Sequence, residues 1–380
     1  MSQDIRPFRL DIPQAELDDL RARLANTRWP EAATGEPWQQ GAPLADVQAL
    51  CSYWADGYDW RRCEAMLNGF GQYVTEIDGL DIHFLHVRSP HDEALPLLMT
   101  HGWPGSVIEF HKIIGPLTDP TAHGGRAEDA FHVVVPSLPG YGFSGKPTET
   151  GWSVERIARA WFALMQRLQY DRFMAQGGDW GAMVTLAMAA EPTPALAMAH
   201  VNLLFAAPNE EERASLSPRE QAALESIQRY HSDGNGYAIQ QSTRPQTLGY
   251  ALTDSPAGQA AWIFEKFREW SDCDGDPLSV FDRDELLDNI MLYWLPAAAA
   301  SSARLYWESF RNISPRAASV PLACSIFPGE TSRPSRAWAE RLYPTLAYWG
   351  EPECGGHFAA FEQPELFVNE LREASAIARQ

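Results

Sequence analysis

The residues that most clearly suggest chemistry lie in the sequence Gly177-Gly178-Asp179-Trp180-Gly181, between an apolar strand and a helix of small residues. Glycines around a central side chain are typical of a sharp strand-to-helix turn that presents a nucleophile. A carboxylate is ionised at pH 7 without a base, so Asp179 could attack an sp³ carbon and form an alkyl ester. No Gly-x-Ser-x-Gly sequence occurs, which disfavours serine chemistry. The same residues would also suit an aspartate that only caps the following helix.

An alkyl ester on an aspartate must be cleaved by water, and this step needs a base. His357, in Gly355-Gly356-His357-Phe358 after the last predicted strand, is the candidate base. Glu330, in Pro328-Gly329-Glu330 after the preceding strand, would orient its imidazole. Taken alone, each residue would be interpreted as an ordinary loop side chain. Their joint placement favours a catalytic pair. With a usual histidine pKa of about 6.5, we expect turnover to fall in acid.

Ester hydrolysis also needs hydrogen-bond donors for the developing oxyanion. The sequence His101-Gly102-Trp103-Pro104 directly follows a buried strand. We expect the backbone N–H groups of Trp103 and Trp180 to form this oxyanion hole. Without Asp179, the first of these segments would be interpreted as a simple turn.

The elements that must position these residues alternate along the chain. Strands predicted near residues 97–99, 132–135 and 172–175 alternate with helices, and strands at 321–327 and 346–349 follow later. This pattern predicts an α/β fold with a mostly parallel sheet covered on both faces. The order nucleophile, acid, histidine is that of the α/β-hydrolase fold.

Four parts are expected in the chain. Residues 1–72 form an N-terminal meander that wraps the core, with a helix at 13–24 and an irregular Trp-rich and Pro-rich stretch to about residue 70. Residues 73–205 form the first part of the core, beginning with a hairpin around Asp78-Gly79. Residues 206–317 are helical and rich in aromatics, which predicts a lid over the strand ends where ligands of such sheets bind. Residues 318–380 complete the core.

Several motifs together resemble one family. They are residues 5–30, His101-Gly102-Trp103-Pro104-Gly105-Ser106, residues 177–181 and 355–358, and the lid sequences at 236–240, 243–247 and 254–258. In these motifs the chain resembles the epoxide hydrolases of the microsomal and juvenile-hormone type. The resemblance implies Asp179 as nucleophile, His357 as base and Glu330 as orienting acid.

The same resemblance assigns two lid tyrosines, Tyr237 and Tyr306, which would hold the oxirane oxygen and protonate it. Spacing alone could not choose them over Tyr230, Tyr250 and Tyr293. Membrane-anchored members of the family carry an apolar N-terminal helix that this sequence lacks, which favours a soluble bacterial-type member.

Composition and charge restrict the partners. The 380 residues carry a formal net charge of −20 without a basic run, which argues against nucleic acid. Five scattered cysteines, never in Cys-x-x-Cys spacing, argue against a zinc site or disulfide framework and favour the cytoplasm. The Gly-x-Gly-x-x-Gly sequence at 140–145 is predicted to be a turn, because no helix follows it. We expect no cofactor, no metal and no membrane contact, and the sequence leaves a homodimer open.

The sequence therefore predicts an enzyme that converts an apolar epoxide and water to a vicinal diol. The aromatic residues of the lid leave an aromatic epoxide open as the substrate. Substrate contacts are expected from Trp103, Trp180, Phe264 and Phe358. A haloalkane dehalogenase is one alternative, against which the paired lid tyrosines count. A catalytically silent binding protein is another, against which the intact set of Asp179, His357 and Glu330 counts.

Overall fold

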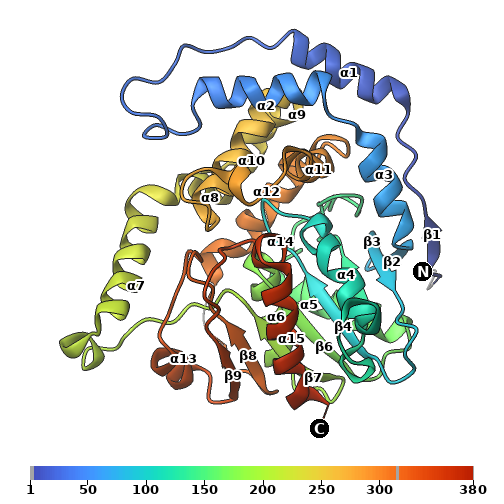
Figure 1. Cartoon of the computed structure of the whole chain (residues 1–380), viewed down its shortest axis with the longest axis vertical. Coiled ribbons are helices and arrows are strands. Elements are labelled where there is room, and N and C mark those ends of the chain that lie inside the picture. Colours follow the sequence, from blue (N-terminus) through green and yellow to red (C-terminus); the bar gives the residue numbers. More distant parts are fainter. Residues whose placement is uncertain (1–3, 314–315, 380) are drawn as a thin grey trace.

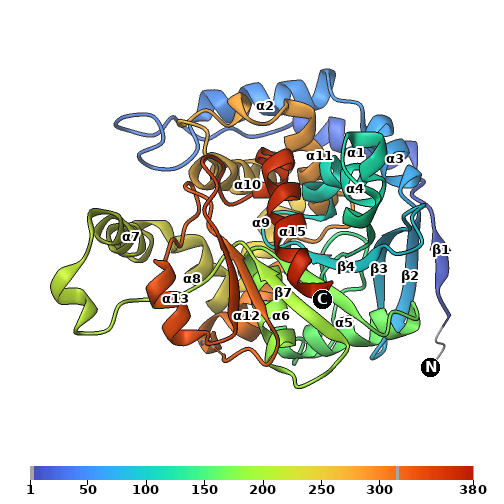
Figure 2. The same cartoon turned by 60° about the horizontal axis from the view of Figure 1, so that its bottom comes forward.

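A nine-stranded sheet runs through the middle of the computed structural model, which describes residues 4–313 and 316–379 (Figure 1). Residues 1–3 of the expected meander, residues 314–315 of the expected lid and residue 380 lie outside the described residues. Helices cover both faces of the sheet, and a helical layer lies across one end of it (Figure 2).

The sheet joins a small antiparallel part to a larger parallel part. Its strands lie in the order β1 (Arg6–Phe8), β2 (Gln72–Ile77), β3 (Leu80–Val87), β5 (Phe131–Pro136), β4 (Leu95–Thr100), β6 (Phe173–Gly177), β7 (Leu196–Val201), β8 (Leu322–Ser325) and β9 (Leu346–Gly350). The first four are paired antiparallel, and the pairs from β5–β4 to β8–β9 are parallel. The hairpin expected around Asp78-Gly79 joins β2 to β3, and both turn residues have positive φ. Strand β7 was not identified from the sequence.

Two pairs of helices cover the sheet. Helix α4 (His111–Thr118) packs with α15 (Pro364–Ala378), and α5 (Val154–Arg167) packs with α6 (Asp179–Ala190) on the opposite face (Figure 1). Every residue of β5 and β6 is buried, as expected for parallel strands that are covered on both faces.

The N-terminal segment contains more helix than expected. Helix α1 (Gln14–Ala25) confirms the first prediction, with Leu17, Leu20 and Leu24 buried. The expectation of an irregular stretch to about residue 70 is wrong, because α2 (Leu44–Asp56) and α3 (Trp60–Gly69) lie there. Helix α2 buries Val47, Leu50, Cys51 and Trp54, the spacing of one helical face.

The layer over the carboxyl ends of the parallel strands is helical. It contains α7 (Pro218–Arg229), α8 (Gly236–Thr243), α9 (Pro245–Asp254), α10 (Pro256–Trp270), α11 (Arg283–Trp294) and α12 (Ala299–Ser309). A π-helical turn, Tyr230–Gly234, connects α7 to α8. The short helices α13 (Arg336–Leu342) and α14 (Ala359–Glu362) belong to the last part of the chain. Among the described residues, no helix is both long enough and apolar enough to cross a bilayer.

Candidate active site

Asp179 lies on the sharp turn that the sequence predicts. Strand β6 ends at Gly177, and α6 begins at Asp179 with a φ of +47°, a conformation that non-glycine residues seldom adopt. A Cβ on Gly177 would lie 2.1 Å from the Gly181 carbonyl oxygen, and one on Gly181 would lie 1.9 Å from the Thr100 oxygen. Glycine is therefore required at both positions for α6 to pack against β4 and β6.

The Asp179 carboxylate is held from two sides. The backbone N–H of Trp103 donates to its Oδ1 at 2.7 Å. The Oδ2 atom lies 3.4 Å from Nε2 of His357. The side chain of Asp179 is 17% exposed and that of His357 only 4%, so the two groups meet with little solvent between them.

Glu330 orients the imidazole from its other nitrogen. Its Oε1 lies 2.8 Å from Nδ1 of His357, and its side chain is fully buried. The hydroxyl and the backbone N–H of Thr331 donate to the same oxygen. A parallel bridge between Gly329 and Gly356 joins the two loops. The structure thus brings Asp179, His357 and Glu330 together as expected.

The electrostatics of His357 differ from those of an ordinary histidine. Burial alone would lower its pKa, but the Glu330 carboxylate and the contacts with Asp179 raise the pKa well above its usual value. The charge of the imidazole therefore depends on the two carboxyl groups that contact it. The expectation of an ordinary pKa is wrong for the free protein.

Two tyrosines from the helical layer lie near Asp179. Tyr237 on α8 and Tyr306 on α12 have ring centroids 5.8 Å apart. Trp103 stacks on Tyr237 at 5.0 Å, and Trp180 packs edge-on against Tyr306 at 4.8 Å. Burial, with contributions from the neighbouring tyrosine hydroxyls and Asp179, raises the pKa of both hydroxyls well above the usual value. Both are therefore neutral hydrogen-bond donors.

These groups face a single cavity of about 770 Å³. Asp179, His357, Tyr237 and Tyr306 all contribute to its wall. The rest of the wall is mainly apolar and includes Trp180, Met183, Leu186, Leu203, Phe205, Ile227, Trp270, Phe310 and Ile313. The Asp179 carboxylate, the His357 imidazole with its partner Glu330, and two hydroxyl donors thus converge on a space suited to an apolar molecule.

Comparisons with known proteins agree with this geometry. A family model described as the epoxide hydrolase N terminus matches residues 5–110, and one described as the alpha/beta hydrolase fold matches residues 96–245. The chain is 58% identical to an inferred epoxide hydrolase of Stigmatella aurantiaca, over 97% of this chain and 84% of that protein. The chain belongs to the epoxide hydrolase family.

More distant epoxide hydrolases share the whole fold. Epoxide hydrolase 1 of Sus scrofa is 35% identical over all of this chain and 90% of its own length. The crystal structure of juvenile hormone epoxide hydrolase from the silkworm Bombyx mori superposes with a TM-score of 0.90 at 30% identity, covering 100% of this chain and 95% of that one. The predicted α/β-hydrolase fold and the predicted enzyme class are confirmed.

The substrate-contact residues expected from the sequence divide into two groups. Trp180 lies on the cavity wall. Phe264 packs against Trp38 at 5.7 Å, and Phe358 stacks on Phe267 at 4.2 Å. Neither phenylalanine is among the described residues that line the cavity. Trp103 contributes to the site through its backbone N–H, which donates to Asp179, and through its ring contact with Tyr237. The structure therefore gives no support to substrate contacts from Phe264 and Phe358.

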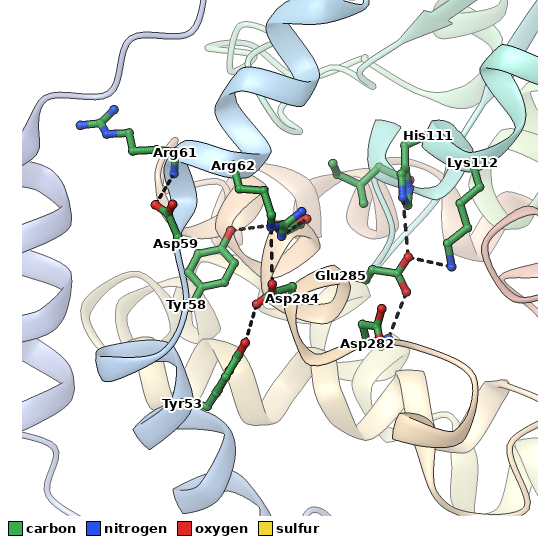
Figure 3. A network of polar contacts seen from close by, with 12 residues as sticks. Tyr53, Tyr58, Asp59, Arg61, Arg62, His111, Lys112, Asp282, Asp284 and Glu285 are labelled. Atoms are coloured by element: carbon green, nitrogen blue, oxygen red, sulfur yellow. Dashed lines mark hydrogen bonds and ion pairs between the residues drawn. The ribbon is translucent and has the colours of Figure 1, made fainter.

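Helix α11 connects this epoxide hydrolase site to the N-terminal segment, and no sequence pattern predicts this link. Arg62 of α3 lies beside Asp284, and Tyr53 of α2 donates to the same carboxylate (Figure 3). The Arg62 Nε atom is 3.4 Å from Oδ2 of Asp284, and the Tyr53 hydroxyl is 2.9 Å from its Oδ1. Arg62 also contacts both oxygens of the buried Asp288 at 2.7 Å. On the other side of α11, Glu285 pairs with Lys112 of α4 at 2.7 Å (Figure 3).

The same helix holds the loop that carries Trp103. The Asn289 amide donates to the Pro104 carbonyl oxygen, and the Tyr293 hydroxyl donates to the Gly105 carbonyl oxygen, both at 2.7 Å. The Ser106 hydroxyl donates to the Asn289 side-chain oxygen. No sequence signal singles out Asn289, because its role depends on two elements about 185 residues apart in the chain.

A carboxyl group next to the site was also missed. Removal from solvent raises the pKa of Glu109 to about 8, with a further contribution from Asp179 and an opposing one from His357. Its Oε1 lies only 1.4 Å from where a Cβ on Gly105 would stand. The Ser-x-x-Glu spacing at 106–109 would have predicted only a helix cap.

Proposed function

We propose that the chain converts an apolar epoxide and water to a vicinal diol through a covalent ester on Asp179. The Oδ1 atom accepts the Trp103 N–H, so Oδ2 is the atom that attacks a ring carbon. The bond between that carbon and the ring oxygen breaks, and its electron pair stays on the oxygen. Tyr237 or Tyr306 supplies the proton that turns this oxygen into the first hydroxyl of the diol.

Water then cleaves the ester. His357 removes a proton from water, and the resulting hydroxide attacks the Asp179 carboxyl carbon. Negative charge develops on Oδ1, which is held by the Trp103 N–H and, in our assignment, by the Trp180 N–H. Collapse of this intermediate breaks the bond between the carboxyl carbon and Oδ2. The leaving oxygen takes the remaining water proton from the carboxyl group and becomes the second hydroxyl of the diol, and Asp179 returns to a carboxylate.

The electrostatics of His357 give these steps their order. Its high pKa depends in part on the charge of Asp179 and on the contact with it. Esterification removes that charge, so the pKa of His357 falls and the imidazole can act as a base. Glu330 remains in place to stabilise the imidazolium that forms.

The convergence of Asp179, the His357–Glu330 pair and two buried tyrosine hydroxyls on one cavity carries this proposal. An alkoxide needs a proton donor, whereas a halide does not, so the paired tyrosines argue against a haloalkane dehalogenase. The intact set of reacting groups argues against a silent binding protein. We also propose a cytoplasmic location, which the five free cysteines support, while homodimer formation stays a prediction.

The test separates the two half-reactions. The His357→Gln variant, incubated with styrene oxide, is expected to gain the mass of one epoxide on the peptide that contains Asp179. The double variant that also carries Asp179→Asn should gain no mass there. An adduct on another residue, or none, would refute the assignment, and chloride release from chloroalkanes by the wild type would favour the dehalogenase.

A further inference from the structure

A third tyrosine lies beside the two already described. Tyr230 lines the same cavity as Asp179, and its hydroxyl oxygen is 3.3 Å from that of Tyr237. The side chain is partly buried. Removal from solvent raises its pKa, and Asp179 contributes to this rise. Its hydroxyl is therefore a neutral donor close to the reacting groups.

The local backbone explains how Tyr230 reaches Tyr237. Residues seven apart in a continuous α-helix lie about 10 Å apart along the axis. Here α7 ends at Arg229, and the wider π-helical turn Tyr230–Gly234 intervenes before α8. The interrupted helix lets the two hydroxyls meet, and π-helical turns are frequent at functional sites.

The surroundings of Tyr237 show why such a partner matters. Its ring is packed by Trp103 at 5.0 Å and by Trp270 at 5.1 Å. When Tyr237 gives its proton to the opening oxirane, negative charge develops on its phenolic oxygen. The packed indoles cannot solvate this charge, and the Lys266 ammonium lies over the ring, 4.9 Å from its centroid. A hydrogen bond to the oxygen itself comes from a neighbouring hydroxyl, and those of Tyr230 and Tyr306 are both in contact with it.

We propose that Tyr230 is a positioning residue for oxirane opening, which acts by donating to the phenolic oxygen of Tyr237. This proposal rests on the proposed function. In the resting site either hydroxyl can donate to the other across this 3.3 Å contact, whereas a charged Tyr237 oxygen can only accept. The proton that Tyr237 gives to the alkoxide is replaced by the one that His357 takes from water, so no external reactant is needed.

The experiment isolates ester formation in a His357→Gln background, in which the ester accumulates. Rapid quenching and mass spectrometry then give the rate of ester formation from styrene oxide. Adding Tyr230→Phe should slow this step about tenfold, the loss expected for one hydrogen bond to a charging atom. Adding Tyr237→Phe instead of Tyr230→Phe should slow ester formation more than Tyr230→Phe does. Adding Tyr250→Phe is the matched control, because Tyr250 is 73% exposed on α9, and should change nothing.

Two further readouts distinguish this role from simple packing. The Tyr230→Phe effect should shrink for para-nitrostyrene oxide, whose alkoxide is a weaker base, and ester hydrolysis with His357 intact should keep its rate. Tyr230→Leu should slow ester formation as much as Tyr230→Phe. Slowing by the leucine variant alone would show that the ring matters and would overturn the proposal.

The failure of either idea can be recognised separately. If Tyr237→Phe slows ester formation while Tyr230→Phe behaves like Tyr250→Phe, the proposal for Tyr230 is overturned and the proposed function stands. If Tyr237→Phe has no effect, Tyr306 is the proton donor and the proposal for Tyr230 is overturned, while the proposed function stands. If the adduct is not on Asp179, the proposed function itself is refuted.

Discussion

Replacing Gly181 with alanine tests whether the close packing of α6 on β4 sets the geometry of the site. The added Cβ would lie 1.9 Å from the Thr100 oxygen and 2.6 Å from its carbonyl carbon. Both neighbours are backbone atoms, so α6 or β4 must move by about 1 Å to reach even a tight contact near 3.0 Å. Thr100 is the last residue of β4, and this movement would pass directly into the loop that carries Trp103.

We expect two consequences from this shift. Overpacking should lower the free energy of unfolding by about 2 kcal/mol. Because the Trp103 N–H lies 2.7 Å from Asp179 Oδ1 in the intact site, a displacement of about 1 Å should slow the chemical steps about a hundredfold. Urea unfolding followed by circular dichroism measures the first effect, and single-turnover kinetics measure the second.

Gly69→Ala is the matched control for this experiment. A Cβ on Gly69 would meet nothing within 4 Å, and the residue ends α3 without a positive φ. This variant should be at least as stable as the wild type and equally active. If Gly181→Ala kept both its stability and its rates within about twofold, the close approach of α6 to β4 would not control the site.

Two further predictions concern charged groups. The pKa of His357 is raised partly by Asp179, and this contribution is lost in the ester. The midpoint pH at which ester hydrolysis falls in acid should therefore be lower than the midpoint of the His357 titration in the free enzyme, measured by NMR. Coincident midpoints would contradict this. Arg62→Met should lower the free energy of unfolding at pH 7 by about 2 kcal/mol, because it leaves the buried Asp288, which is 2% exposed, without its cation. The loss is smaller than for a fully buried pair because Arg62 itself is 41% exposed. Burial already raises the pKa of Asp288, so the loss should shrink as the pH falls and the carboxyl becomes protonated. A loss that is independent of pH, or equal to that of the exposed control Arg21→Met, would speak against this account.

The sequence predicted the parts of the fold that local patterns encode. The sharp turn at Asp179, the hairpin at Asp78-Gly79 and the apolar central strands all have short-range signals, and each is found where expected. Helix α2 was missed although its apolar residues have helical spacing, because nearby prolines and glycines suggested an irregular segment. Strand β7, Leu-Ala-Met-Ala-His-Val, has few of the β-branched residues that mark strands.

The site was predictable only where motif and chain order carry the information. Asp179, His357 and Glu330 follow strands in a recognisable order, and they meet in space. The side chains that support them, such as Asn289, come from elements distant in sequence, and their type alone gives no signal. Phe264 and Phe358 show the converse, because an aromatic side chain suits a packed core as well as a cavity wall.

The indole rings around Asp179 and His357 have a practical consequence. Trp103 packs against Tyr237 and Trp180 against Tyr306, and Trp270 lies 5.0 Å from the His357 ring. These three of the fourteen tryptophans in the chain would sense the loss of charge at Asp179 directly. The enzyme therefore carries its own fluorescent reporter, and the change in emission during a stopped-flow experiment should follow each covalent event without any added label.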